Sequence, residues 1–86
     1  MGEDEMIIVK IRLFSMVRYA LNTSTLEMKL KEGSTVKNLL KNIIAMKPEK
    51  LDGLPIRGAV NKEYVKENHI LHDKDEVALI PPVSGG

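Results

Sequence analysis

Three stretches of the chain alternate between apolar and polar residues, with the period of two typical of a strand that has one buried face. They cover residues 6–14, 25–31 and 76–80. The residues expected to face the core are Ile7, Val9, Ile11, Leu13, Leu26, Met28, Leu30, Val77 and Leu79. The opposite parity places Phe14 and Ile80 on the outer face of the sheet.

A helical pattern lies between the second and third of these stretches. Apolar residues recur there at i, i+3, i+4, i+7 and i+8, which is typical of an amphipathic helix; they are Val36, Leu39, Leu40, Ile43 and Ile44. Ser34 or Thr35 is a suitable N-cap, but neither is followed three residues later by the Glu or Gln of a capping box. Lys47 and Pro48 mark the end of this helix.

The remaining segments predict connections and short elements. Residues 15–24 form a connection with a turn of helix around 16–21, and residues 48–55 form a loop with a turn at Asp52-Gly53. Short strands are expected at 56–60 and 64–65, and a turn at 73–75. Residues 1–5 read as a solvated acidic leader that orders little.

The order of elements predicts an α+β fold with a mixed sheet of four to five strands packed on one main helix, because a sheet face and a helix stripe can bury each other. The first two strands are expected to pair antiparallel. If the first and last strands are parallel neighbours, the residues between them are ample for the crossover. We expect one domain over residues 1–80 and a projecting, flexible tail over residues 81–86.

Composition limits the chemistry that this chain can perform. It has 86 residues, an apolar fraction of 43%, a net charge of +1 and no cysteine. The absence of cysteine excludes disulfides, thiolate metal ligands and cysteine nucleophiles. The charges are mixed along the chain, so nucleic acid is not expected as a partner. No apolar run approaches the roughly 20 residues that span a bilayer, so no membrane association is expected, and we expect a cytoplasmic location.

His69 and His72 are the two histidines, and they lie near Glu67, Asp73 and Asp75. These side chains could in principle bind a metal ion, but their spacing matches no motif with a known mechanism. We therefore expect an ordinary surface loop and no metal site.

The last six residues, Pro81 to Gly86, carry the candidate chemistry. Pro81 and Pro82 cannot donate hydrogen bonds to a β-ladder and favour an extended path, so pairing should end near Ile80. Six extended residues reach about 19 Å, far enough to enter another protein. Gly85 and Gly86 remove side chains from the leading end. The delivered group is then the carboxylate of Gly86, whose activation needs a nucleotide-using partner; the alternative is a frayed end without function.

The sequence also resembles a known family. Residues 75–86, with Pro81-Pro82-Val83-Ser84-Gly85-Gly86 at their end, resemble the C-terminal signature of the small (MoaD-type) subunit of molybdopterin synthase, within the MoaD/ThiS family of ubiquitin-like sulfur carriers. Residues 12–15, 17–18, 33–36, 39–40 and 59–65 are similar to the first strand and loop, the helix start and the third strand of that family. The resemblance extends over nearly the whole chain from residue 7.

The resemblance implies a β-grasp fold and the role of a sulfur carrier. Gly86 would be adenylated by an E1-like enzyme that uses ATP, and then converted to a thiocarboxylate with a sulfur donor. The tail would dock into the large synthase subunit, where the sulfur passes to a pyranopterin precursor of molybdopterin. On this interpretation the chain is a recyclable co-substrate that holds no cofactor stably and is not a catalyst by itself.

The resemblance also implies roles for individual residues outside the tail. Phe14 and Ile80 match apolar family positions that contact partners, in agreement with the outer face that alternation gives them. Arg18 matches a basic position near the partner surface, although a solvated loop arginine is an equal alternative. Asn61 is expected to satisfy local backbone groups.

Three alternative functions stay open from the sequence. The chain could be a sulfur carrier for thiamine, tRNA thiolation or the tungsten cofactor, although thiamine carriers usually lack the Phe-containing first strand and the two prolines. It could be a ubiquitin-like modifier that joins Gly86 to lysines of other proteins. It could also be an interaction module with an inert end.

Overall fold

The computed structural model describes residues 5–81 of the chain. Its first strand, β1 (Met6–Leu13), alternates exposed and buried residues along its whole length. The inward residues Ile7, Val9, Ile11 and Leu13 are at most 5% exposed. This confirms the predicted parity, because the period of two places every second side chain in the core.

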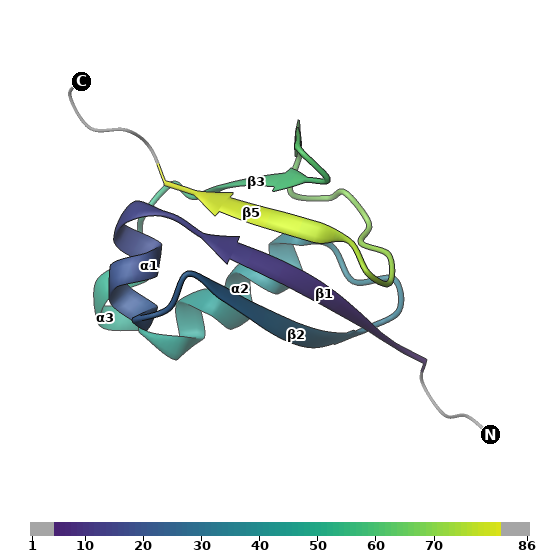
Figure 1. Cartoon of the computed structure of the whole chain (residues 1–86), viewed down its shortest axis with the longest axis horizontal. Helices are drawn as coiled ribbons and strands as arrows, with labels where there is room; N and C mark the ends of the chain where they lie inside the picture. Colours follow the sequence, from purple (N-terminus) through teal and green to yellow (C-terminus); the bar gives the residue numbers. More distant parts are fainter. Residues whose placement is uncertain (1–4, 82–86) are drawn as a thin grey trace.

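Strand β1 lies inside the sheet because both of its edges are paired (Figure 1). One edge pairs antiparallel with β2 (Thr25–Lys31), and the other pairs parallel with β5 (Glu76–Ile80). Strand β3 (Arg57–Val60) pairs antiparallel with β5, and β4 (Glu63–Val65) adds to its far side. The sheet is therefore mixed, with the order β2-β1-β5-β3-β4.

Helix α2 (Val36–Met46) covers the inner face of this sheet and crosses behind the strands in Figure 1. Its apolar stripe is buried at Val36, Leu39, Leu40 and Ile43, as the spacing predicts. A five-stranded mixed sheet with a central parallel pair and one main helix across it is the β-grasp fold. The expected α+β class and the expected number of strands are thus confirmed.

The start of α2 differs from the sequence prediction. Thr35 is the N-cap, and a capping box is present although neither Glu nor Gln follows at the third position. Asn38 takes that role, because its Oδ1 accepts the N–H of Thr35 (2.8 Å) while its own N–H donates to Thr35 Oγ1 (3.3 Å). An asparagine amide oxygen satisfies the free N–H as a carboxylate would.

Two short helices flank the main one. Helix α1 (Ser15–Leu21) confirms the expected turn of helix after β1. Helix α3 (Pro48–Leu51) corrects the expectation of a loop over residues 48–55. Pro48 both ends α2 and begins α3, because proline fits the first helical turn, where no N–H partner is needed. Leu51 is fully buried and anchors this turn in the core, and Asp52-Gly53 forms the expected turn after it.

The two ends of the described chain differ from the predicted leader and tail. Residues 1–4 lie outside the described residues, but Glu5 extends the ladder, since its carbonyl accepts the N–H of Glu32 (2.9 Å). Strand β5 ends at Ile80, as the prolines predict, and Pro81 is buried. The packed part of the chain therefore includes Pro81. Within residues 5–81, no helix has the length and apolar character that crossing a membrane requires.

Gly58 permits a close approach of the sheet to α2. A Cβ atom at this position would lie 2.9 Å from Cγ1 of Val36, in the first turn of the helix. Valine is stiff at χ1, so this methyl group cannot easily turn away. Any side chain at position 58 would therefore push β3 and α2 apart.

We predict that Gly58→Ala lowers the free energy of unfolding by about 1–3 kcal/mol through overpacking. Val36→Ala should cost less in the Gly58→Ala background than in the wild type, because it removes the clashing methyl group. Urea unfolding of the two single variants and the double variant measures this coupling. Strictly additive effects would contradict the proposed close contact.

Candidate functional site

The tail expected to carry the chemistry lies almost entirely outside the described residues. Pro82, Val83, Ser84, Gly85 and Gly86 fall in this part, and only Pro81 of the six is described. The candidate site in the structure is therefore the surface where β5 ends and the tail begins. Its geometry follows from the strands on either side of β5.

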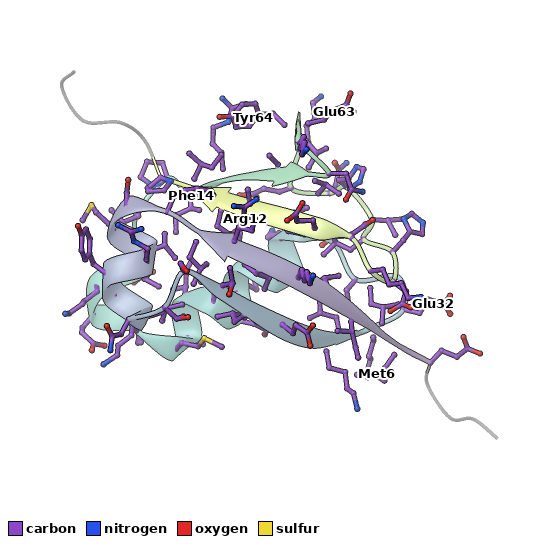
Figure 2. All side chains as sticks on the ribbon, viewed as in Figure 1. Met6, Arg12, Phe14, Glu32, Glu63 and Tyr64 are labelled. Atoms are coloured by element: carbon purple, nitrogen blue, oxygen red, sulfur yellow. The ribbon has the colours of Figure 1, made fainter. Side chains whose placement is uncertain are left out.

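The parallel pairing of β1 and β5 brings Phe14 next to Ile80. Leu13 and Leu79 are register partners and both point into the core. One residue further along both strands, Phe14 and Ile80 point to the outer face. Phe14 is 40% exposed and Ile80 is half-buried. Figure 2 shows Phe14 beside the end of β5, so the two residues predicted to contact partners lie together.

Phe14 is held in this position by the change from strand to helix. It is the N-cap of α1 with extended backbone angles, and its carbonyl accepts the N–H of Val17 (3.1 Å). The next residue, Ser15, has a φ of 50°, in the left-handed region that few residues other than glycine adopt. The chain therefore turns inward directly after Phe14 and leaves its ring on the outer face.

Arg57 and Tyr64 extend this surface on the other side of β5. Arg57 is the register partner of Ile80, and its guanidinium carbon lies 4.4 Å from the ring centroid of Tyr64 on β4. Both side chains are exposed, and Figure 2 shows Tyr64 beyond β3, at the edge of the sheet. We call Phe14, Ile80, Arg57 and Tyr64 the tail-base patch.

A shallow depression of about 170 Å³ adjoins the tail-base patch. Two small side chains that face each other in the register, Ala59 and Ala78, lie in it. On its rim Arg12 and Glu76 form an ion pair with 3.7 Å between Nη1 and Oε2. Sites for small molecules usually measure about 300–1,000 Å³. The depression suits a side chain of another protein better than a substrate.

Asn61 fixes the start of β5 and confirms its expected structural role. Its Oδ1 accepts the N–H of Glu76 (3.0 Å), and its side-chain amide donates to Asp75 Oδ1 (3.0 Å). Asn61 and Lys62 both have positive φ, as a two-residue hairpin of type I′ requires. This turn sets the register of β3 and β4, and with it the place of Tyr64.

Residues 69–75, which contain both histidines, form a turn that is held by hydrogen bonds. The N–H of His72 donates to Asp75 Oδ2 (2.8 Å), and the carbonyl of His69 accepts the N–H of Val36 (3.0 Å). Asp73 accepts the N–H of Ile8 (2.8 Å). Over residues 5–81, His, Asp and Glu form no group of three that could hold a metal ion.

Arg18 lies on α1 and is exposed. Its guanidinium carbon is 5.5 Å from the ring centroid of its neighbour Tyr19. Among the described residues, the guanidinium of Arg18 thus has its cation–π contact with a ring on α1 itself, and not with Phe14. Arg18 is therefore a solvated arginine of α1, and its contact with a partner stays a prediction.

Comparison with known proteins assigns the family. The model of the ThiS family matches residues 11–86, which is most of the chain. The chain belongs to the ThiS family. A relative in this group, the molybdopterin synthase sulfur carrier subunit of Chlamydomonas reinhardtii, is 37% identical over 91% of this chain and 98% of its own length.

Solved structures agree with this assignment to the ThiS family. A candidate molybdopterin converting factor subunit 1 from Pyrococcus furiosus has a TM-score of 0.79 and 29% identity, covering 90% of this chain and 99% of that one. The small archaeal modifier protein 1 of Methanosarcina acetivorans has a TM-score of 0.70 and 29% identity, with coverage of 95% and 99%. A complex of subunits 1 and 2 of the molybdopterin-converting factor of Helicobacter pylori contains a chain with a TM-score of 0.63 and 26% identity, with coverage of 93% and 100%.

Sequence reasoning missed Arg57 and Tyr64 as members of the candidate site. Residues 56–60 and 64–65 were expected as strands, but alternation within one strand does not reveal which strand lies beside it. The Asn61-Lys62 pair carries the available signal, since it predicts a tight hairpin between the two strands.

We predict that Phe14 contributes little to folding although it is the chain's one phenylalanine. Phe14→Ala should lower the free energy of unfolding by less than about 1 kcal/mol, as most exposed sites do. The adjacent control Leu13→Ala should cost about 2–5 kcal/mol, because it opens a core cavity. Urea unfolding tests both variants, and equal losses would show that Phe14 belongs to the core.

Proposed function

We propose that this chain is the sulfur carrier subunit of a molybdopterin synthase, and that the carboxylate of Gly86 is its reactive group. The observation that carries the proposal is the match of its ThiS-family sequence to relatives named molybdopterin synthase sulfur carrier subunit, at 37% identity over 98% of the Chlamydomonas protein. The terminal run Pro81-Pro82-Val83-Ser84-Gly85-Gly86, which resembles the C-terminal signature of this subunit, is present.

The geometry of the described residues supports a carrier. Strand β5 is held between β1 and β3, so its end is fixed relative to the core. The chain leaves that end at Pro81, beside the outward-facing Phe14 and Ile80. A rigid base with an apolar surface at its exit suits delivery of a chain end into another protein, because little docking energy is lost in ordering the base.

The proposed chemistry takes place on the terminal carboxylate. A carboxylate oxygen of Gly86 attacks the α-phosphorus of ATP on an E1-like enzyme, releasing pyrophosphate and leaving an acyl-adenylate. Sulfur at the oxidation level of hydrosulfide then attacks the carbonyl carbon, a C–S bond forms as the C–O bond to AMP breaks, and loss of the proton leaves a thiocarboxylate. The sulfur is now a nucleophile that is held on a carrier and can be passed to a pyranopterin precursor in the large subunit.

In this scheme the side chains of the carrier do not catalyse either step. The E1-like enzyme would supply the ATP site, and the large subunit would supply the site of sulfur transfer. A large-subunit partner is supported by the Helicobacter pylori complex of subunits 1 and 2, whose chain shares the fold and 26% of residues. The proposal includes a cytoplasmic location and the threading of residues 82–86 into both enzymes, since Pro81 is buried in the domain. It places Phe14, Ile80 and Arg18 on the contact surface.

We predict that incubation with the E1-like enzyme, ATP and a sulfur donor increases the intact mass by the exchange of one oxygen for sulfur at Gly86. Deletion of Gly86, or Gly86→Val, should abolish this gain, because the terminal carboxylate is then one residue short of the activating site or its path is blocked by a side chain. Intact-protein mass spectrometry measures both results. Unchanged urea unfolding of the variants controls for folding, and a mass gain that persists without Gly86 would refute the proposal.

Protein modification is a second candidate function, favoured by the likeness to the small archaeal modifier protein 1 of Methanosarcina acetivorans. The same activated Gly86 would then form an isopeptide bond with a lysine of another protein. Mass spectrometry of cell extracts distinguishes the two. Tryptic peptides that carry residues 75–86 on a lysine would support modification, because Lys74 is the last cleavage site in the chain, while thiocarboxylate without such peptides would support the carrier.

A further inference from the structure

Arg57 is a charged residue of the tail-base patch that the proposed sulfur chemistry does not use. Its guanidinium is fixed above Tyr64, and its backbone is the register partner of Ile80. Stacking on an aromatic ring orients a guanidinium while leaving its N–H groups free to bind an anion. The side chain thus presents an oriented positive charge next to the base of the tail.

This charge has no acidic partner within the described residues. Arg12, the neighbouring cation, is paired with Glu76, but no carboxylate in residues 5–81 pairs with Arg57 or with Lys62 on the rim of the depression. The outer face near the tail therefore carries an excess of positive charge around an apolar centre. A complementary surface would be apolar in the middle and acidic at its rim.

The length of the tail allows the reactive carboxylate of Gly86 to lie far from Arg57. The five residues after the packed Pro81 would span about 16 Å if extended, so the carboxylate of Gly86 can act far from the end of β5. Nucleotide phosphates and the precursor would be bound where the tail ends. An anion that meets Arg57 belongs instead to the protein surface that receives the base of the tail.

We propose that Arg57, held by Tyr64, binds a carboxylate on the large subunit. The inference rests on the proposed function, because it assumes that the large subunit receives the tail. Tyr64 is a positioning residue, since it acts through the guanidinium. The carboxylate lies at the rim of the surface that covers Phe14 and Ile80.

Binding of the full chain to its cognate large subunit tests the proposal by isothermal titration calorimetry. Arg57→Glu should raise the Kd at least about tenfold at low salt, because a rim attraction becomes a repulsion, and added salt should reduce the difference. Arg57→Lys keeps the charge and should stay closer to the wild type. Arg57→Gln serves if Arg57→Glu fails to fold, and should weaken binding by a smaller factor.

Lys29→Glu is the matched control. It makes the same change of charge on the same sheet, at the register partner of Ile8 near the opposite end of β1. It should change the Kd less than about twofold, since separated surface charges are screened by salt. If Arg57→Glu weakens binding no more than Lys29→Glu, the inference is overturned.

Crosslinking gives a second, independent readout. In Arg57→Lys an amine replaces the guanidinium, and a zero-length carbodiimide should couple it to an Asp or Glu of the large subunit. Peptide mass spectrometry identifies the residue, and its change to Lys should restore binding of Arg57→Glu. A crosslink of Lys29 to the large subunit with none from position 57 overturns the inference.

These results are distinguishable from a failure of the proposed function. If the wild-type chain binds no large subunit, or gains no sulfur with the E1-like enzyme, the proposed function fails. If the wild type does both and the Arg57 variants bind equally well, only the role of Arg57 fails.

Discussion

The parallel pairing of β1 with β5 is the constraint on which the rest of the structure depends. It joins the first and last strands along one register, Lys10 with Glu76 through Leu13 with Leu79. Because side chains alternate, this one register places Ile11, Leu13, Val77 and Leu79 in the core. The same register sets Phe14 beside Ile80 on the outer face, where the chain leaves the sheet. A shift by one residue would bury both and expose the core residues.

The two faces of the sheet have different roles. The inner face and α2 form the core, and the described residues leave no buried side-chain polar atom without a hydrogen-bond partner. The outer face carries charges, two facing alanines and the tail-base patch. A member of the ThiS family can therefore change its outer face without loss of the core. Residues of the outer face can therefore serve partner binding while the inner face maintains the fold.

The sequence predicts most of the fold because its strongest signals are periodic. The alternation in residues 6–14 and the stripe from Val36 to Ile44 lead directly to β1 and α2. The errors arise where a residue takes a role that the usual sequence pattern does not include. Pro48 ends one helix and begins another, and Asn38 serves in a capping box where Glu or Gln was required. The place of Phe14 and Ile80 on the outer face was predictable from parity and resemblance. The place of Arg57 was not, since it depends on the register between β3 and β5.

The central claim is that this chain delivers sulfur from its own terminus to a cofactor precursor bound by the large subunit. A single-turnover reaction tests it most directly, with thiocarboxylated protein carrying isotopically labelled sulfur, the cognate large subunit and the precursor, and with no other sulfur source. The account predicts that the label appears in the dithiolene product while the terminus of the carrier returns to a carboxylate. A labelled terminus that stays intact beside unlabelled or absent product would contradict it.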